Sequence, residues 1–179
     1  MKWRGRFNLM VLLLVILATP VLAYSVLVEP PKVRTADLGI TFDEFKAAYN
    51  ENAVLNDAPL LKTRNFNLVQ GREFEYTFDP EFKINGTIDS RTGKINRIVL
   101  KCGISDYMSY KVTFKLASTV FGGIVQTLSP AMNGDERAAM FKAFYTTTSG
   151  ATTVGKIRYG KRLVLDNDET LIFWAEPKK

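Results

Sequence analysis

The sequence of 179 residues contains no histidine and one cysteine, Cys102. Without histidine, the chain lacks the imidazole that acts as a base beside a serine or cysteine nucleophile, as a metal ligand and as a sensor of near-neutral pH. A single cysteine excludes a disulfide within the chain and a zinc site made of several thiolates. These absences remove the commonest nucleophilic and zinc-dependent enzymes, and we expect no cofactor and no metal.

The cysteine itself is expected to be buried. It ends the run Ile98 to Cys102, in which alternation places it on the same face as Ile98 and Leu100, and a free cysteine packs as a small hydrophobic residue. The alternatives are a reactive thiol or a disulfide between two molecules.

A strong excess of one charge is also lacking. The chain has 24 basic and 18 acidic residues, and three of the basic residues, Lys2, Arg4 and Arg6, lie at the very start. Without them the net charge falls from +6 to +3. So small an excess gives no reason to expect binding to nucleic acid.

The longest apolar run lies just after these cations, over residues 9–18. A basic start, an apolar segment of this length and a small residue, here Ala23, form the pattern of a secretory signal peptide. We therefore predict that residues 1–23 are a signal peptide, with cleavage before Tyr24. The predicted location is secreted or periplasmic, outside the cytoplasm.

The alternative is an uncleaved membrane anchor, because further apolar residues extend the segment to residues 7–28. Thr19 and Pro20 interrupt this longer segment, and a proline inside a helix costs about 3 kcal/mol. Cleavage is therefore the favoured prediction. The membrane would be a partner only through an uncleaved segment.

The rest of the chain is long enough for one compact domain. Residues 24–37 contain Pro30-Pro31 and are predicted to be an extended linker, and residues 38–179 are predicted to be a single α+β domain. Thr41 to Glu44 has the pattern of a capping box, in which a threonine hydroxyl and a glutamate carboxylate bond each other's backbone N–H groups. It predicts a helix over 42–53.

Alternation of apolar and polar residues then predicts a four-stranded antiparallel meander. In the second of its strands Phe74, Tyr76 and Phe78 share one face, whereas Glu73 and Glu75 lie on the other. The aromatic face is expected to be core rather than a ligand platform. The predicted strands cover residues 67–70, 73–78, 82–88 and 95–102.

Two helices and three strands are predicted to follow. Apolar residues at spacings of three and four favour a helix over 106–128, although the residues of 107–114 are also good strand formers and leave a strand there as the alternative. A second helix follows the capping residues near Asn133. The predicted strands are 154–158, 162–165 and 170–174, with turns at 159–160 and 166–169.

The order of elements is therefore helix, four-strand meander, two helices, three-strand meander. A helix followed by a meander occurs twice, which suggests a tandem duplication whose two halves share one extended antiparallel sheet packed against the helices. This order is similar to that of small secreted inhibitor proteins built from tandem helix-and-meander units. Architecture alone carries little weight for function.

The strongest candidate for a binding surface is the segment around the predicted turn at 159–160. Four cations and one aromatic residue gather in seven positions, and such a hairpin tip is suited to an acidic protein or an anionic surface. The competing interpretation is that cations protect a sheet edge from pairing with other molecules. The candidate residues are Lys156, Arg158, Tyr159, Lys161 and Arg162.

These observations favour an exported, non-enzymatic binding protein, either inhibitor-like or an accessory of the cell envelope. Its partner would be a protein or an anionic envelope or extracellular surface, and the oligomeric state is left open. The alternative is a carboxylate-dependent glycan hydrolase. Glu73 and Glu75 lie about 7 Å apart along one strand face, within the range of carboxylate separations in inverting glycosidases.

Overall fold

The computed structural model describes residues 36–55, 66–69, 71–104, 109–165 and 169–179, which belong to one compact unit, Thr35–Lys179. The predicted signal peptide 1–23, most of the linker 24–37, the start of the helix predicted at 106 and most of the turn 166–169 lie outside the described residues. No helix in the described part is long and apolar enough to span a membrane.

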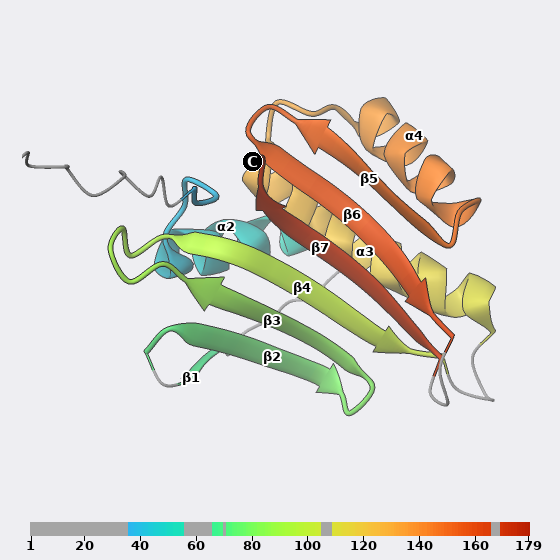
Figure 1. Ribbon diagram of the computed structural model, residues 1–179, viewed down its shortest axis with the longest axis horizontal. Coiled ribbons are helices and arrows are strands. Elements are labelled where there is room, and N and C mark those ends of the chain that lie inside the picture. Colours follow the sequence, from blue (N-terminus) through green and yellow to red (C-terminus); the bar gives the residue numbers. More distant parts are fainter. Residues whose placement is uncertain (1–35, 56–65, 70, 105–108, 166–168) are drawn as a thin grey trace, which may run out of the picture. The chain divides into compact units, whose positions relative to one another are not determined.

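The described residues form the predicted α+β fold, with helices packed on an antiparallel sheet (Figure 1). One helix precedes a four-strand meander, two helices follow, and a three-strand meander comes last. The predicted order of elements is thus confirmed. The elements are α2 (Phe42–Leu55), β1 (Asn67–Val69), β2 (Glu73–Asp79), β3 (Phe82–Ile88), β4 (Ile95–Gly103), α3 (Tyr110–Leu128), α4 (Gly134–Tyr145), β5 (Ser149–Val154), β6 (Ile157–Val164) and β7 (Thr170–Pro177).

The two meanders join into one seven-stranded sheet. Its order is β1-β2-β3-β4-β7-β6-β5, so the last strand of each meander lies at the centre and pairs antiparallel with the other. The central pairing sets Val99 opposite Trp174 and Leu100 opposite Phe173. The run Leu171 to Trp174 lies in β7, which has a strand neighbour at each edge. Leu171 and Phe173 are buried on the helix-covered face, and Ile172 and Trp174 lie on the other face.

The start of α2 follows from its sequence. The Thr41 hydroxyl and the Glu44 carboxylate bond each other, and Glu44 also accepts from the Thr41 N–H at 2.9 Å. These bonds lower the pKa of the Glu44 carboxyl group. Phe45 and Tyr49 lie one helical turn apart on the face of α2 that packs toward the sheet, and both are fully buried. The capping box and the helix it predicts are both confirmed.

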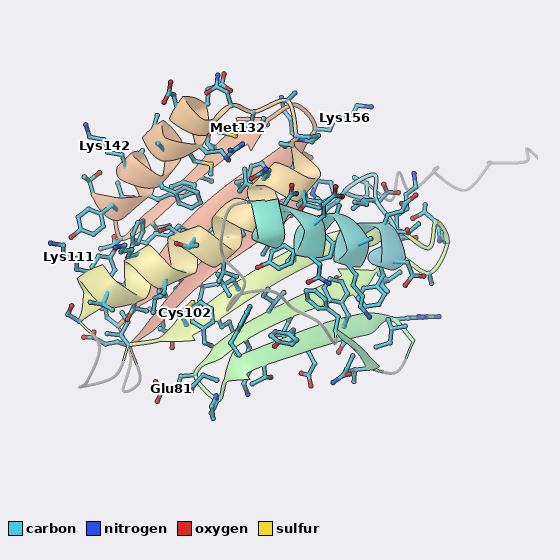
Figure 2. The ribbon with its side chains drawn as sticks, turned by 180° about the vertical axis from the view of Figure 1, so that it is seen from behind. Glu81, Cys102, Lys111, Met132, Lys142 and Lys156 are labelled. Atoms are coloured by element: carbon cyan, nitrogen blue, oxygen red, sulfur yellow. The ribbon has the colours of Figure 1, made fainter. Side chains whose placement is uncertain are left out.

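All three described helices lie on the same face of the sheet, which Figure 2 shows from the helix side. The core between them and the sheet is rich in aromatic rings. Phe173 of β7 lies 5.1 Å from Phe121 of α3 and 6.2 Å from Phe144 of α4, measured between ring centroids. On the other half, Phe74 of β2 packs against Phe45. The prediction that Phe74, Tyr76 and Phe78 are core is confirmed for Phe74, while Tyr76 and Phe78 are partly buried and pack against the core.

Cys102 is fully buried, as are Ile98 and Leu100 on the same strand face. It pairs with Phe82 of β3 and with Leu171 of β7. Burial raises the pKa of its thiol. The structure therefore supports the packing role expected from the alternation and not a reactive thiol.

The predicted strand boundaries near the C-terminus are wrong. Strands were expected at 154–158 and 162–165 with a turn at 159–160, but β5 ends at Val154 and β6 runs without a break from Ile157 to Val164. The turn is instead at Gly155 and Lys156. Gly155 has φ of +57°, a conformation that glycine adopts far more easily than other residues.

Candidate functional site: the open face of the sheet

The five residues predicted at a hairpin tip do not lie together. Only Lys156 is at the turn, and the others alternate along β6. Arg158 and Arg162 are exposed on the sheet face that has no helix, whereas Tyr159 and Lys161 point into the helix-covered core and are fully buried. Side chains of successive strand residues point to opposite faces, so the segment divides into two groups.

The two buried residues hold the core together. The Tyr159 hydroxyl is 2.7 Å from the Ser129 hydroxyl just after α3, and burial raises the pKa of Tyr159 to about 12. The Lys161 ammonium donates to the Tyr110 hydroxyl at 3.1 Å and to the Thr147 carbonyl. Burial lowers the pKa of Lys161. Neither side chain is available to a partner on the open face.

Lys156 lines a separate groove of about 1020 Å³ at the end of the sheet, near the end of α3. Three other lysines, Lys94, Lys178 and Lys179, also line this groove, with Asp37 as its acidic residue. The groove is therefore cationic. It lies at the opposite end of β6 from Arg162, so it does not extend the open-face group.

No described helix covers the second face of the sheet (Figure 1). Strand pairing places Val99 of β4, Trp174 of β7 and Gly160 of β6 in one row across this open face. The next row contains Lys101, Ile172 and Arg162. Apolar side chains of the central strands thus lie beside cations on this open face.

The Trp174 ring lies directly on the backbone of Gly160. A Cβ atom added to Gly160 would be 2.1 Å from the nearest ring carbon, much closer than van der Waals contact allows. Gly160 is buried by this ring, while Trp174 remains partly exposed. Cross-strand contact between an aromatic residue and a glycine stabilises a strand that the glycine weakens, and here it holds the Trp174 ring against the open face of the sheet.

Cations lie in the rows on either side of this ring. Arg158 forms an ion pair with Glu176 across β6 and β7, with 3.1 Å between nitrogen and oxygen. Arg162 and Lys101 are exposed one row away, beside Ile172. We define the Trp174 surface as Val99, Lys101, Arg158, Arg162, Ile172 and Trp174.

Glu73 and Glu75 lie on the same open face, nearer the β1 edge. Both are exposed and line one hollow of about 230 Å³ together with Asn85, Thr87 and Arg97. Their placement on one side of β2 confirms the predicted alternation. A hollow that contains two carboxylates and one guanidinium is the arrangement nearest to a hydrolytic site among the described residues.

Comparisons with protein-family models, with curated proteins and with solved structures give no match. The site therefore rests on its own residues. Arg158 and Arg162 were predicted from the sequence as binding residues, but Trp174, which carries the surface, was not. The run Leu171 to Trp174 was the signal in the sequence that could have revealed it, because this run is apolar on both faces of a central strand. If helices cover only one side of the sheet, the apolar residues on the other side form an uncovered surface.

Proposed function

We propose that the protein is an exported binding protein without catalytic activity, and that the Trp174 surface binds an acidic partner protein outside the cytoplasm. The observation that carries the proposal is the Trp174 ring, held flat on Gly160 and partly exposed beside arginines. Tryptophan and arginine are the residues most enriched among those that dominate binding energy at protein interfaces. The cations give the surface a preference for acidic partners.

The location of the partner follows from the N-terminal segment. A basic start, an apolar run and Ala23 support export, and either secretion or retention in the periplasm places the Trp174 surface outside the cytoplasm. The mass of the mature protein tests this. A chain that starts at Tyr24 is a released protein, and a chain that retains Met1 is tethered to the membrane.

The binding surface can be tested with poly-L-glutamate as a defined acidic probe. In the chain that starts at Tyr24, Trp174 is the only tryptophan, so its fluorescence reports on the proposed surface. We expect the probe to change Trp174 emission at low salt and to lose affinity as salt rises, since exposed charges are screened. Arg162→Glu should weaken binding at least tenfold.

The matched control is Lys115→Glu. Lys115 is exposed on α3, which lies on the other face of the sheet, and its reversal changes the net charge by the same amount. We expect its affinity to stay within twofold of the unmodified chain. Equal weakening by both variants would mean that only net charge matters, and the Trp174 surface would then be rejected.

A carboxylate-dependent glycan hydrolase is the second candidate, favoured by the hollow that Glu73 and Glu75 share. An inverting hydrolase needs one carboxylic acid to protonate the leaving oxygen and one carboxylate to activate water. The test is release of reducing ends from a panel of polysaccharides. Activity in the unmodified chain that Glu73→Gln or Glu75→Gln removes would establish this function and overturn the non-enzymatic proposal.

A further inference from the structure

The two edges of the sheet differ in length. β1, at one edge, has three residues, whereas β5, at the other, has six and pairs with β6 alone. A sheet edge presents backbone N–H and C=O groups that have no strand partner. β5 is therefore the longer surface of this kind among the described residues.

The pairing with β6 shows which residues of β5 direct these groups outward. Leu163 donates its N–H to the Thr148 carbonyl, so Thr148 bonds toward β6. In an antiparallel pair the bonded positions alternate, so Gly150, Thr152 and Val154 also bond toward β6. Ser149, Ala151 and Thr153 direct their N–H and C=O groups away from the sheet, and their side chains are exposed.

The sequence of β5 itself has none of the features that block an edge. Native proteins protect edge strands with charged residues, proline, bulges or short length. The sequence of β5 is Ser-Gly-Ala-Thr-Thr-Val, without charge or proline, and its register with β6 is regular. The cations that the sequence analysis interpreted as edge protection lie one strand further in, on β6.

We propose that β5 takes an extended acidic segment of a partner protein as an eighth strand of the sheet. Its backbone would bond Ser149, Ala151 and Thr153, as in other cases where a peptide is added to a sheet edge. Arg162 gives the charge preference. Arg162 of β6 is paired with Ser149 of β5. Neighbouring strands are about 4.8 Å apart, so a strand added beside β5 lies about 10 Å from β6. A glutamate of the added strand opposite Ser149 can therefore reach Arg162 over the small serine side chain.

The alternative occupant of this edge is β5 of a second copy of the chain, but the position of α4 argues against such a dimer. α4 packs on the core face of β5, where Phe144 borders Gly150, and it extends past β5 in Figure 1. Antiparallel pairing of two identical edges requires a two-fold axis perpendicular to the sheet, which places both copies of α4 on the same side of one junction. A single added strand needs no second helix there.

This inference rests on the proposed binding function and shares Arg162 with the Trp174 surface, but its test changes no residue of that surface. The probe is an eight-residue fluorescent peptide of alternating threonine and valine with one central glutamate. In the full chain we expect Ala151→Pro to weaken binding at least tenfold, because proline removes an outward N–H without removing a bond to β6. The matched control Ala151→Thr keeps the N–H and should retain binding.

Amide hydrogen exchange gives a second readout. On addition of the peptide, we expect slower exchange at Ser149, Ala151 and Thr153 and no change at Lys101. A peptide methylated on the amides that face β5 should not bind.

Three results would overturn the inference: equal affinity of the unmodified and Ala151→Pro chains, no binding by the unmodified chain, or a concentration-dependent dimer that Ala151→Pro abolishes. The last would assign the edge to a second copy. In any of these cases, binding of poly-L-glutamate that depends on Arg162 would still support the proposed function.

Discussion

Two glycines of the sheet lie beneath aromatic rings, one on each face. Gly160 is covered by Trp174 on the open face, and Gly86 is covered by Phe74 on the helix side. In both cases the ring belongs to the directly opposite residue of the neighbouring strand. The difference is in the freedom of the ring, since Phe74 is fully buried in the core and Trp174 is partly exposed.

We therefore expect Gly86→Ala to destabilise the protein more than Gly160→Ala. An added methyl group in a closed core forces neighbours to shift and typically costs about 1–3 kcal/mol, whereas Trp174 can swing toward solvent. Urea denaturation measures the two changes. Gly160→Ala should also shift Trp174 emission to longer wavelength, and an equal loss of stability in both variants would contradict the expected difference in ring freedom.

Lys161 is the one fully buried charged residue among those described. It donates hydrogen bonds to neutral oxygens, and its ammonium lies 5.4 Å from the centroid of the Tyr110 ring. Burial penalises the charged form and lowers its pKa. The folded protein consequently binds this proton less tightly than the unfolded chain does.

The contribution of Lys161 to stability should therefore rise with pH as the side chain loses its proton. The window runs from the lowered pKa in the folded state up to the ordinary value near 10.5, because the unfolded chain binds more protons within it. Lys161→Met should remove this dependence. Urea denaturation of both chains at several pH values measures the effect. The free energy of unfolding of the unmodified chain relative to the variant should increase with pH. A difference that stays constant with pH would contradict a lowered pKa of Lys161.

At the scale of elements, α3 contains two adjacent glycines that weaken a helix. The structure shows that they face different neighbours. A Cβ atom on Gly123 would lie 3.0 Å from the Tyr49 ring of α2, while one on Gly122 would lie 3.7 Å from the Phe141 ring of α4. Gly123 thus permits the close approach of α2, and Gly122 has room for a methyl group.

Substitution by alanine should separate these roles. Gly122→Ala should stabilise the protein by up to about 1 kcal/mol, the usual gain in a helix interior. Gly123→Ala should gain less or destabilise, because the Tyr49 ring must retreat. Thermal and urea denaturation of the two variants provide the comparison, and a larger gain from Gly123→Ala would rule out the close contact with Tyr49.

The sequence predicted these elements to different degrees. The capping box at Thr41 and the alternation of Phe74 to Phe78 are local patterns, and both α2 and β2 were found as predicted. The turn between β5 and β6 was misplaced because Gly155 and Gly160 are both plausible turn residues. What separates them is the Trp174 ring on Gly160, a contact between strands that no local pattern reveals. For the same reason, the Trp174 surface was missed.

At the scale of the whole molecule, Cys102 lies where the two meanders meet. It is fully buried between Phe82 and Leu171, on the strand that joins both halves of the sheet. Its side chain lies on the helix-covered face with Ile98 and Leu100. Its thiol should therefore become accessible only when the helices separate from the centre of the sheet.

The reaction of Cys102 with a thiol reagent should accordingly report global unfolding. Without denaturant we expect labelling to be at least a hundredfold slower than in urea-unfolded protein, since exposure requires the least frequent opening of the structure. The labelling rate should follow urea concentration in parallel with the loss of circular dichroism. Native-state labelling as fast as that of the unfolded chain would show that the junction opens locally.

The central position of β7 also determines when the fold can be completed. Of the seven strands, β7 leaves the ribosome last, and it fills the gap between β4 and β6. Until then, the first meander and the β5–β6 hairpin each lack their inner neighbour, and β4 and β6 each present an unpaired edge. The nascent chain thus cannot complete its sheet until its synthesis has passed residue 177.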